Sequence, residues 1–325
     1  MKKTLIASSI AFSTLAFGQS AVALDVTPSG FVDMVWTLSD GTDLGKYGAE
    51  GRFDTSGELD VEANLKEGIS MRFDADINPG SAGGDSGRLE QIFLNWNIDE
   101  KMALKGGVFN NNLTWEREDA PDMYQITHGQ LWDIWESTTV EDGNNLAGLE
   151  FSYQLEKVKL MVGYLNDLRN DIPAASDKNS VKVAGEIKAM DNLDITVGLI
   201  TQDQALENIV DIHATWKTGK LLVGGEILFA DELIDSGFMV MANYQISDKF
   251  SATGRFDFVS YDSAFLADDT SSITVAGLYS ISKNLFANAE IRFNDDGNQQ
   301  PGDIEPRGAG EGDGTTARLE LLATF

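Results

Sequence analysis

The sequence predicts an all-β protein, a single closed antiparallel β-barrel of about sixteen strands that crosses a membrane. From residue 57 onward, nearly every segment alternates apolar and polar residues with period two, as strands with two different faces do. The connections between these segments are by turns very short and long. After an N-terminal leader, no apolar run reaches the ~18 residues that a membrane helix requires.

The leader occupies residues 1–23 and has the three parts of a secretory signal peptide. Lys2 and Lys3 form its positive start, residues 5–17 its apolar stretch, and residues 21–23 a small-x-small cleavage site. We therefore expect a signal peptide at 1–23 and one barrel domain over 24–325. A buried N-terminal helix is the alternative interpretation of these residues.

The period-two pattern places the strands. In residues 249–258, for example, Phe256 and Phe258 fall on one face and Arg255 and Asp257 on the other. The sixteen expected strands are 31–38, 57–65, 68–77, 89–98, 101–109, 145–155, 158–166, 179–189, 193–202, 208–217, 220–229, 236–246, 249–259, 270–281, 284–293 and 315–325. Even-numbered connections are tiny and odd-numbered ones are longer, which is typical of barrels with short periplasmic turns and long outer loops.

A soluble β-sandwich would also alternate, because one face of each of its strands is buried and the other is wet. Two features favour the barrel. The strands commonly reach nine to eleven residues, which suits a tilted membrane span better than the usual five or six. The outward aromatic residues also fall into two bands, as expected at two membrane–water interfaces. The expected periplasmic band is Trp96, Tyr153, Trp216, Tyr244, Phe250, Tyr279 and Phe325, and the outer band is Trp36, Tyr164, Phe229, Phe238, Phe256, Phe258 and Phe293.

Composition excludes several function classes. Asp and Glu number 52 against 24 Lys and Arg, a formal net charge of -28, which opposes nucleic-acid binding. The chain has no Cys and two His, so thiol catalysis and a multi-histidine zinc site are excluded. The stretch Gly84-Asp85-Ser86-Gly87 is similar to a protease nucleophile turn but is more simply a loop. We expect no catalytic residue and no cofactor.

The leader, the sixteen-strand pattern and the terminal stretch Ala317–Phe325 together resemble a Gram-negative outer-membrane porin. The run Gly106-Gly107-Val108-Phe109, followed by an acidic segment from Trp115 to Tyr124, resembles the putative β-barrel porin families. The resemblance implies export through the periplasm to the outer membrane, where the barrel contacts lipid and lipopolysaccharide. It implies that the barrel-assembly machinery recognises terminal Phe325, and it leaves a homotrimer open.

The alternation also assigns charges to the inner wall, which we expect to be polar throughout and to line a water-filled channel. The basic wall residues are Arg72, Lys105, Lys182, Arg255, Arg292 and Arg318. The acidic wall residues are Asp60, Glu62, Asp74, Asp76, Glu150, Glu186, Glu226, Asp257, Glu290 and Glu320. The alternative is an interior closed by its own ion pairs.

The third outer connection, 110–144, is the longest and is too rich in Trp for a disordered loop. We expect it to fold into the lumen as general porins fold theirs, with a short helix near 128–136. The alternative is a cap over the mouth. Its expected constriction residues are acidic and favour cations in a pore: Glu116, Glu118, Asp119, Asp122, Asp133 and Glu136.

These observations predict a porin that passes small hydrophilic solutes and ions by diffusion, with a preference for cations. The alternatives are a substrate-specific channel and an acidic surface barrel with a closed lumen that binds a partner. The acidic stretch 295–313 could bind Ca²⁺, but it lacks a ligand-spacing motif, so a solvated loop is the simpler interpretation and no metal site is expected.

Overall fold

The computed structural model describes residues 25–39, 52–65, 67–77, 87–138, 144–166, 168, 179–201, 208–231, 234–261, 269–295 and 314–325. The expected signal peptide, residues 84–86 of the Gly-Asp-Ser-Gly stretch and nearly all of the acidic stretch 295–313 lie outside this part of the chain.

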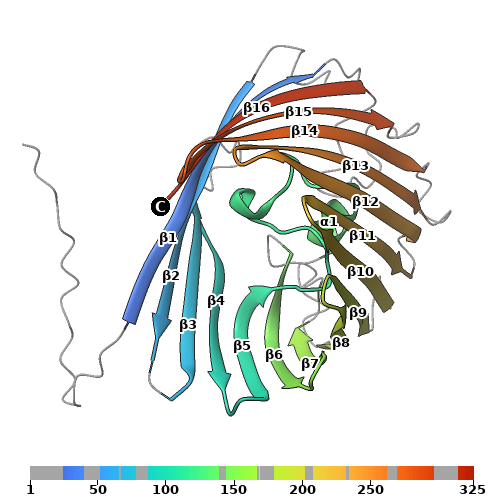
Figure 1. Cartoon of the computed structure of the whole chain (residues 1–325). Helices are drawn as coiled ribbons and strands as arrows, with labels where there is room; N and C mark the ends of the chain where they lie inside the picture. Colours follow the sequence, from blue (N-terminus) through green and yellow to red (C-terminus); the bar gives the residue numbers. More distant parts are fainter. Residues whose placement is uncertain are drawn as a thin grey trace, which may run out of the picture.

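The described strands form one closed antiparallel barrel in which each strand pairs with its sequence neighbours and β1 pairs with β16 (Figure 1). This confirms the expected fold class. The strands are β1 (Asp25–Ser39), β2 (Arg52–Asn64), β3 (Ile69–Ile77), β4 (Arg88–Asn97), β5 (Met102–Asn110), β6 (Asn145–Gln154), β7 (Val158–Asn166), β8 (Asn179–Met190), β9 (Leu193–Thr201), β10 (Asn208–Thr218), β11 (Leu221–Ala230), β12 (Ile234–Ser247), β13 (Phe250–Tyr261), β14 (Thr270–Ser282), β15 (Leu285–Asp295) and β16 (Gly314–Thr324).

Strand bounds agree with the alternation except at the start of the barrel. β1 begins at Asp25 instead of residue 31, and β2 begins at Arg52 instead of residue 57. The two strands pair continuously from Asp25↔Asn64 to Thr37↔Arg52. Pairing with a neighbour therefore extends both strands through residues whose side chains do not alternate, which shortens the expected 39–56 connection.

Outward side chains are apolar and exposed, as a lipid-facing surface requires. Val197 in β9 is 39% exposed, whereas its neighbour Thr196 points inward and is buried. The outward aromatic side chains include Trp96, Tyr244 and Tyr279 near the short turns and Tyr164, Phe229 and Phe293 near the opposite end, all of them exposed.

The inner wall is not polar throughout, which corrects the sequence-based expectation. In the outer half of β7 to β13, the inward side chains are largely apolar and buried, namely Met161, Leu165, Ile200, Ile209, Leu228, Met239, Met241, Val259 and Tyr261. The reason is a packing partner that alternation does not reveal. The chain between β5 and β6 supplies Leu113, Leu131, Ile134 and Trp135 to the same buried cluster.

That connecting chain contains two short helices, η1 (Ala120–Asp122) and α1 (Gln130–Thr138). The helix expected near 128–136 is therefore present, displaced by two residues. α1 packs against β12 and β13 (Figure 1). η1 packs against β16. No helix within the described residues combines the length and the apolar character that a bilayer span demands.

Glycine allows the chain to leave β5 in this direction. Gly107 in β5 pairs directly with Gly148 in β6, and both have positive φ, 132° and 156°. A Cβ at Gly107 would clash with the backbone of Ile92 and Phe93 in β4. The Gly106-Gly107 stretch thus allows a close approach of three strands at the point where the third outer connection begins.

Candidate functional site

Residues 111–138, which we term the inner segment, form the candidate site together with the wall residues that they contact. The segment begins where Asn111 bonds Asn144 at the end of the same connection, with 3.2 Å between Nδ2 and Oδ1. From there it reaches inward side chains on strands from both sides of the barrel.

The first contact is with β7 and β8. Asn112 donates through Nδ2 to Glu186 Oε1 at 2.8 Å and accepts a hydrogen bond from Lys182. Lys182 is 1% exposed, and its Nζ lies 2.8 Å from Glu150 Oε2 in β6. Two expected wall residues, Lys182 and Glu186, therefore hold the inner segment in place, and Lys182 does not face open water.

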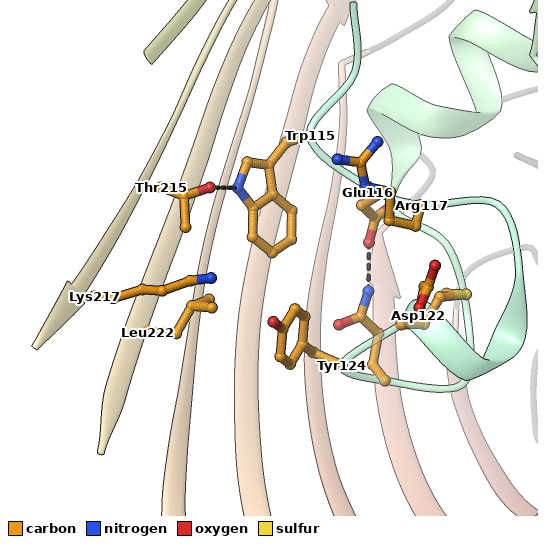
Figure 2. Close-up of a pocket in the computed structure, with 10 residues that line it drawn as sticks. Trp115, Glu116, Arg117, Asp122, Tyr124, Thr215, Lys217 and Leu222 are labelled. Atoms are coloured by element: carbon orange, nitrogen blue, oxygen red, sulfur yellow. Dashed lines mark hydrogen bonds between the residues drawn. The ribbon is translucent and has the colours of Figure 1, made fainter. Parts of the chain in front are cut away.

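The second contact is with β10 and β11. The Trp115 indole N–H donates to Thr215 Oγ1 at 2.9 Å, and the Trp115 backbone N–H donates to Glu226 Oε2 at 2.9 Å. The Trp115 ring lies 6.1 Å from that of Tyr124. Both rings line a cavity of ≈ 290 Å³ whose charged members are Glu116, Arg117, Asp122 and Lys217 (Figure 2). Of these carboxylates, Asp122 is exposed and Glu116 is buried.

The third contact centres on Arg255 of β13, whose side chain is 0% exposed. Its guanidinium lies 2.7 Å from Glu116 Oε1 and 2.9 Å from Asp257 Oδ2, and it donates to the carbonyls of Thr127 and His128 at 2.6 and 2.8 Å. Glu116 also accepts from the Gln125 side chain and the Gly129 N–H. Glu116, Arg255 and Asp257 thus form a buried anchor.

The fourth contact is with β15. Glu290 accepts from the backbone N–H groups of Ile126 and Thr127 at 2.7 and 3.1 Å and from the Thr127 hydroxyl at 2.7 Å. Arg292 donates to the His128 carbonyl at 3.1 Å. Arg318 of β16 lies 3.5 Å from Glu290. These three expected wall residues also contact the inner segment or one of its partners.

α1 contributes the apolar part of the site. Leu131, Ile134 and Trp135 on this helix are at most 2% exposed and belong to the buried cluster of the outer wall. Asp133 on the same helix is buried, and the loss of hydration raises its pKa well above the usual range. Glu136 is half-buried at the next turn. Burial therefore disfavours the charged form of the Asp133 side chain.

Burial also raises the pKa of Glu118 and Glu116, and for Glu116 the charge of Arg255 opposes the rise. Loss of hydration raises the pKa of Asp119 to about 6. Burial lowers the pKa of His128 to about 4, and the nearby Arg255 and Arg292 charges lower it further. Burial therefore disfavours the charged forms of these carboxylates and of the His128 imidazole.

The opposite part of the wall, β2 to β4, is rich in acid. Arg72 binds Asp74 at 2.7 Å and Asp60 at 2.9 Å, and Arg88 lies 3.4 Å from Asp76. Near them, Glu58 of β2, Glu90 of β4 and Asp119 of the inner segment place their carboxylate oxygens within 4.8 Å of one another. Glu58, Asp60 and Asp74 form a second such group. We term these five carboxylates the acidic cluster.

Two members of this cluster were not expected from the sequence. Glu58 lies two residues before Asp60 on the same face of β2, so the alternating pattern could have identified it as an inward residue. Glu90 could not have been found this way, because the pairing of β3 with β4 shifts register between Asp74 and Ala75. At that irregularity Glu90 and Gln91 are both buried, so the strict alternation of inward and outward residues along β4 is interrupted.

The remaining expected residues have separate surroundings. Lys105 lies over the rings of Phe93 and Phe109, with Nζ 5.3 and 5.1 Å from their centroids. Glu320 accepts a hydrogen bond from Asn288 in β15. The Phe325 backbone N–H donates to the Gly30 carbonyl of β1 at 3.0 Å, so the chain end helps to close the barrel.

Comparison with known proteins gives a consistent result. A family model described as "Putative beta-barrel porin-2, OmpL-like" matches residues 49–325. The structure is similar to the anion-selective porin from Comamonas acidovorans (TM-score 0.69, 13% identity, 93% of this chain and 100% of that chain). It is also similar to Pseudomonas putida OprB (TM-score 0.70, 11% identity, 93% and 94%) and to a mutant of Rh. blastica porin (TM-score 0.63, 12% identity, 93% and 100%). No curated protein matches the sequence.

Proposed function

We propose that the chain, which belongs to the OmpL-like putative β-barrel porin-2 family, forms a water-filled channel for passive diffusion of small hydrophilic solutes and ions. The observation that carries this proposal is a closed barrel with apolar side chains outside and paired charges inside. The inner segment narrows the channel because it contacts the wall on both sides. Diffusion through such a channel requires no chemical step.

The proposed location is the outer membrane of a Gram-negative bacterium, with lipid and lipopolysaccharide around the apolar face. Short turns face the periplasm and long connections face outward. Recognition of the Phe325 end by the barrel-assembly machinery and assembly as a homotrimer belong to the same proposal. A truncated chain that lacks Phe325 tests recognition by the assembly machinery. We expect it to give a lower yield of protein inserted into the outer membrane.

The proposed selectivity is a preference for cations. Among the expected constriction residues, Asp122 is exposed beside the cavity of Figure 2, and Asp119 lies in the acidic cluster. Glu116 and Asp133 are buried and contribute less. Because a solved porin of the same fold is described as anion-selective, side chains and not the fold decide the sign of the selectivity.

Planar-bilayer recording of the purified full chain tests the channel. We expect stepwise conductance and, in a KCl gradient, a reversal potential of the sign that K⁺ preference gives. Absence of conductance under all conditions would instead support a surface barrel with a closed lumen that binds a partner. A reversal potential of the opposite sign would retain the channel and overturn the cation preference.

A triple variant, Glu118→Gln, Asp119→Asn and Asp122→Asn, tests which carboxylates set the preference. It retains Glu116, which anchors the segment. We expect a lower cation/anion permeability ratio, most clearly at low salt, because ions screen charges beyond ~8 Å at 0.15 M. The matched control removes three exposed carboxylates in the short turns, Glu156→Gln, Asp191→Asn and Asp248→Asn. Equal changes in both variants would contradict a role for the inner segment.

A second candidate, a substrate-specific channel, is favoured by the cavity of Figure 2. An aromatic pair, Trp115 and Tyr124, lies there beside Asp122, Arg117 and Lys217, which supply hydrogen-bond donors and acceptors. Such a lining can hold a ring-shaped hydroxylated solute against an aromatic face. Concentration-dependent, saturable block of the ion current by such a solute, lost in Trp115→Ala, would support this candidate.

A further inference from the structure

The acidic cluster is distinct from the buried anchor at Arg255. Its members come from four parts of the chain: Glu58 and Asp60 from β2, Asp74 from β3, Glu90 from β4, and Asp119 from the inner segment. Glu58 belongs to both groups of three carboxylates whose oxygens lie within 4.8 Å of one another. Carboxylates at this separation repel one another unless a cation or a proton lies between them.

The charge balance within the cluster is uneven. Arg72 neutralises Asp74 and Asp60, to which it is bound at 2.7 and 2.9 Å. Its distance to Glu58 Oε1 is 4.0 Å, which is too long for a hydrogen bond. The other group, Glu58, Glu90 and Asp119, has a neutral partner in Asn145, whose Nδ2 donates to Glu90 at 3.0 Å.

An independent observation concerns Glu58, which both groups share. The Glu58 side chain is 2% exposed, yet its Oε1 has no hydrogen-bond donor among the described residues. Buried carboxylate oxygens are ordinarily bonded, because an unpaired one loses its hydration without compensation. Glu58 Oε1 therefore has an ion pair with Arg72 at 4.0 Å but no hydrogen-bonded partner among the described residues.

Asp119 is also turned toward the cluster. It occupies the N-cap position of η1, where an Asp side chain commonly accepts a hydrogen bond from the helix backbone. Here it makes no such bond, and its carboxylate lies with those of Glu58 and Glu90 instead. The local helix therefore does not determine the direction of this side chain.

We propose that Glu58, Glu90 and Asp119 bind one divalent cation, Ca²⁺ in preference to Mg²⁺. Oxygen ligands lie about 2.3–2.6 Å from Ca²⁺, so two ligands of one ion are at most about 5 Å apart, which the 4.8 Å limit of the cluster satisfies. Three carboxylates from three segments provide a variable geometry, which Ca²⁺ tolerates better than the smaller, strictly octahedral Mg²⁺.

Such an ion would join the inner segment to the β2–β4 wall, because Asp119 is the ligand that comes from the segment. The opposite side of the segment is already held by Arg255 and Glu290. The bound ion also neutralises carboxylates beside the path of permeating ions. This effect on the current rests on the proposed channel function, whereas binding itself does not.

Isothermal titration of the refolded full chain in detergent with CaCl₂ tests the binding. We expect one saturable site that Asp119→Asn weakens by tenfold or more. Asp122→Asn is the matched control, because Asp122 is an exposed carboxylate three residues further along the same segment and outside the cluster. Glu58→Gln provides a second test from the wall side, and MgCl₂ should bind more weakly than CaCl₂.

Either of two results would overturn the site: no saturable Ca²⁺ binding by the wild-type chain, or equal affinity in Asp119→Asn and Asp122→Asn. Planar-bilayer recording in CaCl₂ and then EDTA separates the two proposals. Ca²⁺ should lower the cation preference of the wild type but not of Asp119→Asn. A chain that binds Ca²⁺ but never conducts would refute the channel and leave the ion site intact.

Discussion

Two regions of the inner wall use charge in opposite ways. On β13 and β15, Arg255 and Glu290 are buried and bind the backbone or side chains of the inner segment. On β2 and β3, Arg72 is 35% exposed and binds acids of its own wall. The first region joins the segment to the barrel, whereas the second keeps its charge beside the lumen.

This difference shows that an inward charged residue of a barrel is not necessarily a pore residue. A guanidinium enclosed by two carboxylates and two carbonyls is structural, since removal of one partner leaves the others buried and unpaired. An ion pair whose cation is partly exposed, such as Arg72 with Asp74, contributes less to stability than a fully enclosed pair and remains able to act on passing ions.

The largest expected effect tests which strand residues face lipid and which face the interior of the barrel. Val197→Arg puts a charge on the lipid side of β9, at a cost of ~2–4 kcal/mol near the midplane. Thr196→Arg is the matched control, because Thr196 lines an inner cavity of ≈ 400 Å³ beside Glu186 and Asp194. We expect Val197→Arg to lower the yield of barrel folded into vesicles. Equal yields of the two variants would show that the faces are reversed.

The next effect separates the two regions directly. Arg255→Met leaves Glu116 and Asp257 without their shared cation, so we expect a loss of ~3–5 kcal/mol of stability, measured by urea unfolding. We also expect trypsin to cleave after the exposed Arg117 as the segment detaches. Arg72→Met should destabilise the barrel less than Arg255→Met does, because Arg72 is 35% exposed although its partner Asp74 is buried, and it should also alter ion selectivity. Comparable destabilisation in both variants would contradict the distinction.

A smaller effect concerns how the segment meets β11. A Cβ at Gly224 would collide with the Trp115 ring, so Gly224→Ala should displace that ring at a cost of ~1–3 kcal/mol. Gly254→Ala is the control, because a Cβ there meets nothing within 4 Å. We expect a shift of tryptophan emission and a changed conductance only in Gly224→Ala. Identical spectra for both variants would argue against the Trp115 contact.

The smallest expected effect is a pH dependence of folding stability that arises from His128, next to the buried anchor at Arg255. The pKa of His128 is lowered to about 4 by burial, whereas in the unfolded chain it is near 6.5. Neutral His128 therefore stabilises the fold above pH 6.5, and this stability is lost as pH falls from 6.5 toward 4. The raised pKa values of Glu116 and Asp133 have the opposite effect, because they increase stability as pH falls. The contribution of His128 is therefore isolated by comparing the wild type with His128→Gln.

Thermal melts of the two proteins at pH 7 and pH 4.5 measure this dependence. The Gln side chain retains a donor for the Arg117 carbonyl, which His128 Nε2 contacts at 3.0 Å. We expect the melting temperature of the wild type to fall by about 2–4 °C more than that of the variant. A larger fall in His128→Gln would mean that burial of the imidazole does not lower its pKa.

The sequence determined the barrel because lipid imposes one simple rule on every strand. Each outward residue must be apolar, so the two-residue period of β9 and β13 alone indicates which residues face inward. The lengths of the connections then fix the order and the direction of the strands. At β1 and β2 this failed, since pairing between neighbours extends both strands through residues such as Ser56 and Thr55 that carry no alternating pattern.

What the inward residues do was decided only by the tertiary structure. Arg72 and Arg255 both lie on the inward face of their strands, and each precedes an Asp by two residues. Arg72 nevertheless borders the lumen, whereas Arg255 is completely buried. Their difference comes from the path of residues 111–138, which brings Glu116 to Arg255 and Asp119 to Glu58. Contacts between residues so distant in the chain depend on how the segment fills the barrel, and period-two alternation carries no information about that path.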